Sequence, residues 1–204
     1  MVSGTNQEGG NEMKATDVDT EVKKFRQPDH EIDPMFINRW SPRSFSDKDV
    51  PEELLYSTLE AARWAPSAKN TQPWRFILAR TKEDRETFHS FIMEGNLKWC
   101  TKAPVLALLI SDSNSGAHAF GAGTAWGYLS LQAAQNGLIT HAIGGFEKEK
   151  AREILNIPED YKLHAVIAIG YQGEKEALPE DLQEREQPSP RRPLEESLYE
   201  GKFE

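Results

Sequence analysis

The sequence of 204 residues contains a single cysteine, Cys100. One cysteine excludes an intrachain disulfide and is typical of chains that fold in the cytosol. Because free cysteine is most often buried, we expect Cys100, flanked by Trp99 and Thr101, to be a packed residue rather than a nucleophile. The N-terminal residues contain no apolar segment of the kind found in secretory signals. These features together predict a cytoplasmic protein.

Long apolar runs and positive net charge are also absent. The longest apolar run, 103–110, is too short to cross a bilayer, so no membrane association is expected. The net charge of −9, from 24 Lys+Arg and 33 Asp+Glu, argues against general binding to nucleic acid. A local group of arginines can still bind a small phosphate compound, since local charge can oppose the net charge.

Familiar catalytic motifs are missing as well. The sequence has no Gly-x-x-x-x-Gly-Lys phosphate loop, no Gly-x-Ser-x-Gly elbow and no His-Glu-x-x-His. The five histidines have no metal-ligand spacing, and no pair of acids stands out for general acid–base catalysis. We therefore predict neither a catalytic side chain nor a metal site, and the pattern favours a bound cofactor that carries the chemistry.

The pattern of apolar residues predicts one α+β domain, residues 31–204, without internal repeats. The polar extension 1–30 is expected to be disordered. The charged, proline-rich tail 172–204 cannot form a core of its own, so it must remain loose or pack on something else, a second subunit being one candidate. Helices are expected at 34–39, from about 51 to before Pro66, and at 83–94, 120–136 and 147–155; strands at 74–79, 105–110 and 163–170; and a short strand or loop at 140–146.

The most informative segment is the polar loop within 65–76. Pro66 ends the preceding helix, and Pro73 is expected to force Gln72 into an extended conformation. Small hydrogen-bonding side chains fill the space between the two prolines, which suits a polar, partly anionic ligand. Taken on its own, the loop is better interpreted as an ordinary helix-to-strand connection with turn residues.

Three further segments could contact such a ligand. Segment 39–45 holds two arginines and two serines around a proline, and arginine suits phosphate recognition, although a solvated turn has the same composition. The glycine pair in 143–146 allows close approach to a ligand or a tight turn. The two arginines in 190–196 favour an anion site or simply solubility. Segment 121–127 resembles a dinucleotide-binding fingerprint only loosely and indicates helix packing through small residues.

In this order, the four segments resemble the FMN-dependent nitroreductase family, over residues 37 to about 196. The motifs are Arg-x-Ser-x-Arg-x-Phe, Ala-Pro-Ser-Ala-x-Asn-x-Gln-Pro-Trp, Ile-Gly-Gly-Phe and Arg-Arg-Pro. The resemblance implies a nitroreductase-like α+β fold with a central, mainly antiparallel sheet flanked by helices. It also implies an intertwined homodimer in which the C-terminal tails are exchanged between subunits, with FMN bound at the subunit interface.

The resemblance further implies which residues bind FMN. The first segment would hold the phosphate, the ribityl chain and the pyrimidine edge, and the second would come from the other subunit. The glycine pair and Asn96 would contact the flavin ring, and the last segment would complete the phosphate site. The whole implied set is Arg39, Trp40, Ser41, Arg43, Pro66, Ser67, Ala68, Asn70, Gln72, Asn96, Ile143, Gly144, Gly145, Arg191 and Arg192.

The implied activity is reduction of nitroaromatic compounds, quinones or related small electron acceptors by NAD(P)H in a ping-pong mechanism. The alternatives are a relative with specialised flavin chemistry, such as dehalogenation or flavin cleavage, and a non-catalytic flavin-binding protein. Three features depart from the family pattern. Trp99 stands where some members carry a basic residue near the flavin. Segment 111–120 leaves little room for a lid over the flavin, and the N-terminal extension lies outside the resemblance.

Overall fold

The computed structural model describes residues 17–203. Its centre is a four-stranded sheet with the strand order β1-β2-β4-β3, in which every neighbouring pair is antiparallel. The strands are β1 (Trp74–Ala79), β2 (Val105–Asp112), β3 (Ile139–Ile143) and β4 (Tyr161–Gly170). The predicted α+β class with an antiparallel sheet is confirmed, and the central position expected for 105–110 is correct.

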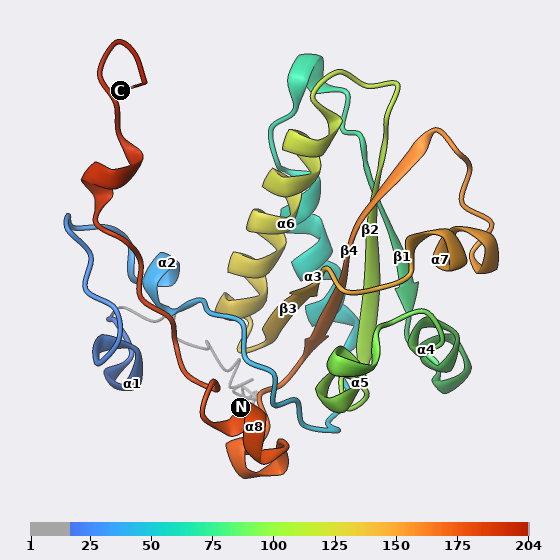
Figure 1. Ribbon diagram of the computed structural model, residues 1–204, viewed down its shortest axis with the longest axis horizontal. Coiled ribbons are helices and arrows are strands. Elements are labelled where there is room, and N and C mark those ends of the chain that lie inside the picture. The colour runs from blue at the N-terminus through green and yellow to red at the C-terminus, as the bar shows by residue number, and fades with distance from the viewer. Residues whose placement is uncertain (1–16, 204) are drawn as a thin grey trace, which may run out of the picture.

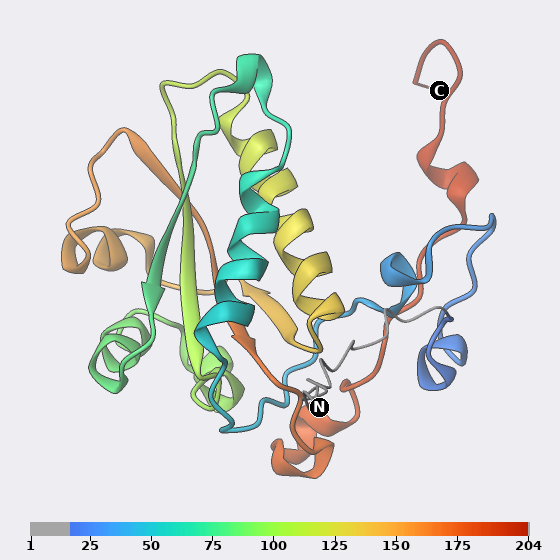
Figure 2. The same ribbon diagram turned by 180° about the vertical axis from the view of Figure 1, so that it is seen from behind.

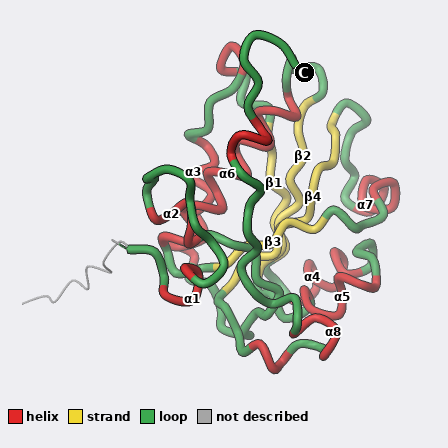
Figure 3. The backbone as a smooth tube through the Cα atoms, turned by 60° about the vertical axis from the view of Figure 1, so that its left-hand side comes forward, coloured by secondary structure: helices red, strands yellow, loops and turns green. Residues whose placement is uncertain are grey.

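Helices cover both faces of this sheet (Figures 1 and 3). Helices α3 (Glu52–Arg63) and α6 (His118–Gln135) pack against each other and against one face. Helices α4 (Lys82–His89), α5 (Glu94–Cys100) and α7 (Lys148–Ile154) lie on the other. Alternate residues of β2 enter the two cores, with Ala107 and Leu109 on the α3–α6 side and Leu106 and Leu108 on the other. Burial on both faces explains the unbroken apolar run of β2.

The two ends of the described chain form what we call the terminal arm, residues 17–33 and 188–203. These two stretches lie side by side, beyond α2 (Pro34–Asn38) and away from the sheet (Figures 1 and 2). The arm contains α1 (Thr20–Lys23) and the 3-10 helix η3 (Leu194–Ser197). Of the extension 1–30 that was expected to be disordered, residues 1–16 lie outside the described residues, and the rest includes α1.

The first part of the tail packs on the body of its own chain. It includes the 3-10 helix η2 (Lys175–Ala177) and helix α8 (Glu180–Gln183). Leu178 and Leu182 are buried in the core beneath α4 and α5. We expected the tail to remain loose or to pack on another part of the structure. This first part packs on the domain of its own chain.

The helix predicted at 83–94 is wrong in extent. The structure ends α4 at His89 and begins α5 at Glu94, so Gly95 lies inside a helix instead of ending one. The chain between the two helices pairs with the segment that follows β3. Met93 N–H donates to the Gly145 carbonyl at 3.1 Å, and Glu147 N–H donates to the Phe91 carbonyl at 2.8 Å. This pairing between distant segments breaks the helix, and no local sequence signal encodes it.

We expect Gly173→Ala to destabilise the fold, because a Cβ at this position would lie 2.8 Å from the backbone C and O of Phe45. Overpacking against backbone costs about 1–3 kcal/mol. Urea unfolding followed by circular dichroism measures the loss. Gly95→Ala is the matched control, since a Cβ there meets nothing within 4 Å. Equal stability of the two variants would contradict the prediction.

Candidate functional site

The first predicted segment, 39–45, is held in an extended path by the start of the tail. Phe45 forms a β-bridge with Gln172, and the Gly173 N–H donates to the Ser44 carbonyl at 2.8 Å. Phe45 is 2% exposed and stacks on Trp99 of α5 with ring centroids 6.1 Å apart. The last residues of the segment are therefore fixed to the core, while Trp40 and Ser41 remain half-buried.

A buried carboxylate that the sequence did not reveal also holds this segment. Glu186 is 7% exposed, and its Oε1 accepts the N–H groups of Arg43 at 2.7 Å and Ser44 at 2.8 Å. Its Oε2 has no hydrogen-bond partner among the described residues. The sequence could not single out Glu186, because the tail contains many acidic residues. Only the fold brings this one to segment 39–45.

His141 of β3 supports the same segment from the sheet. The carbonyl of Pro42 can only accept, so the ring donates from Nδ1 at 3.0 Å. The ring also lies against Trp99, with centroids 4.5 Å apart. Burial lowers the pKa of His141, the charges of Arg43 and Arg39 lower it further, and the hydrogen bond to Pro42 opposes them. His141 is therefore neutral at pH 7.

Three guanidinium groups gather where segment 39–45 meets the terminal arm. Arg39 donates from Nη1 to the Ser41 hydroxyl at 3.2 Å. Burial lowers the pKa of Arg39, and the charge of Arg191 lowers it further. Burial likewise lowers the pKa of Arg26 to about 10, with the charges of Arg191 and Arg39 adding to the effect. The positive charges of Arg26, Arg39 and Arg191 thus lie close enough to influence one another.

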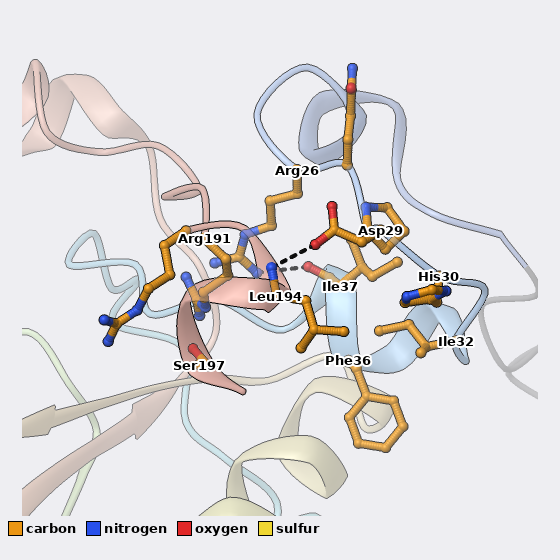
Figure 4. Close-up of a pocket in the computed structure, with 12 residues that line it drawn as sticks. Arg26, Asp29, His30, Ile32, Phe36, Ile37, Arg191, Leu194 and Ser197 are labelled. Carbon is orange, nitrogen blue, oxygen red and sulfur yellow. Dashed lines mark hydrogen bonds between the residues drawn. The ribbon is translucent and has the colours of Figure 1, made fainter. Parts of the chain in front are cut away.

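None of these three arginines forms a salt bridge with a carboxylate within residues 17–203. Arg26 and Arg39 are half-buried, and Arg191 is exposed. Partly buried like charges without a counterion are costly, so such a group favours the binding of an anion. Arg191 is the tail arginine whose charge acts on Arg39, and both Arg191 and Arg192 line a cavity of about 450 Å³. Figure 4 shows this cavity between the two halves of the terminal arm, with Arg26, Ile37 and Leu194 on its wall.

The structure brings Asn96 together with the glycine pair. Asn96 Nδ2 donates to the Gly145 carbonyl at 3.2 Å. A Cβ at position 145 would lie 2.6 Å from that Nδ2, so any other residue there would force the Asn96 side chain to move. A Cβ on the exposed Gly144 would meet nothing within 4 Å. The backbone at Gly144, next to the buried Ile143, is thus open, whereas Asn96 of α5 covers Gly145.

The loop that follows α3 has a strained backbone. It contains the 3-10 helix η1 (Ala68–Asn70), and Lys69, Asn70 and Gln72 have φ of 51°, 55° and 47°. Such values are uncommon for residues other than glycine and cluster at functional sites. The prediction that Gln72 is extended is wrong. The Gln72 N–H donates to the Ser67 hydroxyl at 2.9 Å, which closes the loop into a turn and outweighs the effect of the following proline.

Most of this loop is exposed, namely Pro66, Ala68, Asn70 and Gln72, and Ser67 is half-buried. Gly121 of α6 lies beneath it, where a Cβ would be 3.2 Å from Pro73 Cγ. Within the segment 121–127, Gly121 thus packs on the loop and Ala122 and Ala125 are buried in the core, whereas a Cβ at Gly123 or Gly127 would meet nothing within 4 Å.

Within one chain, loop 66–72 lies far from the other predicted site residues. The loop follows the C-terminal end of α3, while segment 39–45 leads into the opposite end of that helix (Figure 2). The helix has 12 residues and spans about 18 Å.

Other expectations can be compared directly with the structure. Cys100 is fully buried, and burial raises its pKa to about 12, which confirms it as a packed residue. Within residues 17–203, no helix combines the length and apolar character needed to cross a membrane. In the same part of the chain, no three His, Cys, Asp or Glu side chains are grouped so as to hold a metal ion.

Comparisons with known proteins agree with this geometry. The model of the Nitroreductase family matches residues 37–98 and 92–171. A crystal structure of an oxidoreductase containing FMN is 43% identical, with a TM-score of 0.84 over 88% of this chain and 96% of that chain.

Two curated relatives are also named as oxidoreductases. An NADH dehydrogenase/NAD(P)H nitroreductase of Streptomyces coelicolor is 38% identical over 84 residues, which are 41% of this chain and 42% of the relative. An NADH dehydrogenase of Thermus thermophilus is 29% identical over 68% of this chain and 85% of its own length.

The fold and these comparisons define an α+β oxidoreductase. More specifically, the chain belongs to the nitroreductase family, whose model covers most of it. The resemblance drawn from the four motifs is thereby confirmed, and so is FMN as the cofactor of this family.

We expect Glu186→Ala to loosen segment 39–45. The partly buried N–H of Arg43 and the buried N–H of Ser44 would lose their acceptor, at a cost of about 1–3 kcal/mol. Hydrogen exchange at these two amides should accelerate by roughly tenfold or more, because tenfold corresponds to about 1.4 kcal/mol. The exposed Glu184→Ala is the matched control. The same exchange rates in both variants would refute the assigned role.

We expect His141→Asn to flatten the acid limb of the stability profile. The folded protein holds the pKa of His141 below its unfolded value, so its contribution to stability is present above about pH 6.5 and is lost as the pH falls through the folded pKa. Each unit of lowering corresponds to about 1.4 kcal/mol. Urea unfolding at pH 7.5 and pH 5.5 measures the difference, with the exposed His30→Asn as control. An unchanged slope in His141→Asn would contradict this.

Proposed function

We propose that this protein binds FMN and uses NAD(P)H to reduce small electron acceptors such as quinones or nitroaromatic compounds. The observation that carries the proposal is the pair of like charges formed by the half-buried Arg39 and by Arg191, neither of which forms a salt bridge with a carboxylate among the described residues of a chain with net charge −9. A phosphate group supplies the negative charge that such a pair needs. Membership of the nitroreductase family supports FMN as the phosphate compound.

The residues of the chain would divide the binding task by chemistry. Arg39, Ser41 and Arg191 are suited to the phosphate, because guanidinium groups and a hydroxyl donate several hydrogen bonds to its oxygens. Arg43, fixed through its backbone by Glu186, would lie near the pyrimidine edge of the flavin. The Asn96–Gly145 contact would hold the ring from the end of β3.

Bound FMN would supply the two-electron chemistry, accepting hydride from NAD(P)H and passing it to the acceptor in a ping-pong sequence. No side chain need act as a covalent nucleophile. The open backbone at Gly144 leaves room for a planar ring to approach the end of β3.

We further propose that the protein is a homodimer in which loop 66–72 completes the site of the other protomer. Large apolar side chains on the surface support this, since Phe120 of α6 is 77% exposed and Trp64 at the end of α3 is 69% exposed. The tail carries Leu198 and Phe203, the latter 83% exposed, as expected for a segment exchanged between subunits. Exposed apolar groups of this size gain free energy when buried, at about 25 cal/mol per Å².

The proposal is tested on the purified protein. We expect a yellow protein that NADH or NADPH bleaches and a simple quinone reoxidises. Arg39→Ala should weaken FMN binding about 10–100-fold, because hydrogen bonds to charged groups contribute about 1.5–3 kcal/mol. Arg80→Ala is the control, since Arg80 is an exposed arginine that pairs with Glu52. Flavin fluorescence measures the affinities.

The contrary outcomes separate the alternatives. A colourless protein that FMN cannot reconstitute would rule out the proposal. Flavin binding without bleaching would indicate a non-catalytic flavin-binding protein. Bleaching without quinone turnover would favour specialised flavin chemistry, such as dehalogenation or flavin cleavage.

A further inference from the structure

We infer that Arg26, in the N-terminal segment outside the family match, is a positioning residue for the phosphate site and makes that site depend on the N-terminal half of the terminal arm. The inference rests on the proposed binding of FMN. Arg26 would act through Arg39 and Arg191, which it holds in place by contacts with the backbone that carries them.

The hydrogen bonds of Arg26 join two distant parts of the chain. Its Nη1 donates to the carbonyl of Ile37 at 2.7 Å and to the carbonyl of Arg39 at 2.8 Å. Its Nε donates to the carbonyl of Ser189 at 2.9 Å, across 163 residues of sequence. The guanidinium therefore ties the end of α2, where Arg39 begins its segment, to the tail two residues before Arg191.

The choice of acceptors preserves the charge of Arg26. All three acceptors are neutral carbonyl oxygens, and no carboxylate of residues 17–203 forms a salt bridge with this side chain. A carboxylate would have neutralised the guanidinium and weakened the field on an anion. Because arginine has a planar fork of donors, it can make these contacts in two directions at once, which lysine cannot reproduce.

The like charges around Arg26 explain why an anion is needed. The charges of Arg191 and Arg39 both act on it, and the three groups repel one another until a counterion is present. A phosphate monoester carries about −1.5 to −2 charges at pH 7 and balances most of this excess. Arg26 would thus contribute positive potential as well as geometry.

A second contact fastens the same two stretches. The Leu194 N–H donates to Asp29 Oδ2 at 2.9 Å (Figure 4). The Asp29 carboxylate thus binds the tail backbone, and within residues 17–203 it forms no salt bridge with the three arginines. Arg26 and Asp29 therefore bracket Arg191, one on each side along the tail.

The test compares FMN with riboflavin, which lacks the phosphate. We expect Arg26→Gln to weaken FMN binding at least tenfold while changing riboflavin binding less than threefold, as measured by flavin fluorescence. Arg26→Lys should recover part of the FMN affinity, because it restores the charge but not the fork. Lys24→Gln is the matched control, since it removes an exposed positive charge from the same arm and should leave both affinities unchanged. Thermal unfolding of each variant accompanies the titrations.

Three results would overturn the inference. The first is unchanged FMN affinity in Arg26→Gln while the wild-type protein binds FMN, which would leave the proposed function intact. The second is an equal loss of FMN and riboflavin affinity, which would show a general structural effect. The third is failure of the wild-type protein to bind FMN, which would overturn the proposed function together with the inference.

Discussion

The short antiparallel pairing between residues 44–46 and 171–173 determines how the rest of the site is built. The Ser46 N–H donates to the Tyr171 carbonyl at 3.0 Å, and the Gly173 N–H donates to the Ser44 carbonyl at 2.8 Å. This pairing joins the chain that precedes α3 to the chain that leaves β4. The chain before residue 44 and the chain after residue 173 therefore start from the same place on the body, and their far ends meet in the terminal arm.

The contact between the two halves of the terminal arm has an electrostatic consequence. The chain is acidic overall, yet the arm and segment 39–45 direct three guanidinium groups into one volume without a matching carboxylate among the described residues. Carboxylates nearby are engaged elsewhere, Glu186 with the backbone of Arg43 and Asp29 with that of Leu194. Glu186 and Asp29 thus bind backbone N–H groups, and the three arginines remain able to bind a ligand.

Local signals predicted most of the sheet and several helices. Strand β1 was bounded correctly at 74–79, and the helix expected at 34–39 is α2, Pro34–Asn38. The failures lie where distant segments compete with local preference, as at Met93, whose N–H bonds to Gly145, and at Gln72, which Ser67 draws into a left-handed turn. Arg26 and Glu186 could not be found for the same reason, because their roles arise from carbonyl or amide groups far away in sequence.

The bridge from Arg26 to Ser189 also has a consequence for biosynthesis. Its two residues are 163 positions apart, so the ribosome must make nearly the whole domain before they can meet. The sheet and its helices can fold as a unit beforehand, whereas the arm closes last. Newly made protein would therefore pass through a stage with a finished body and an open anion site, and cofactor loading would be a late event in its maturation.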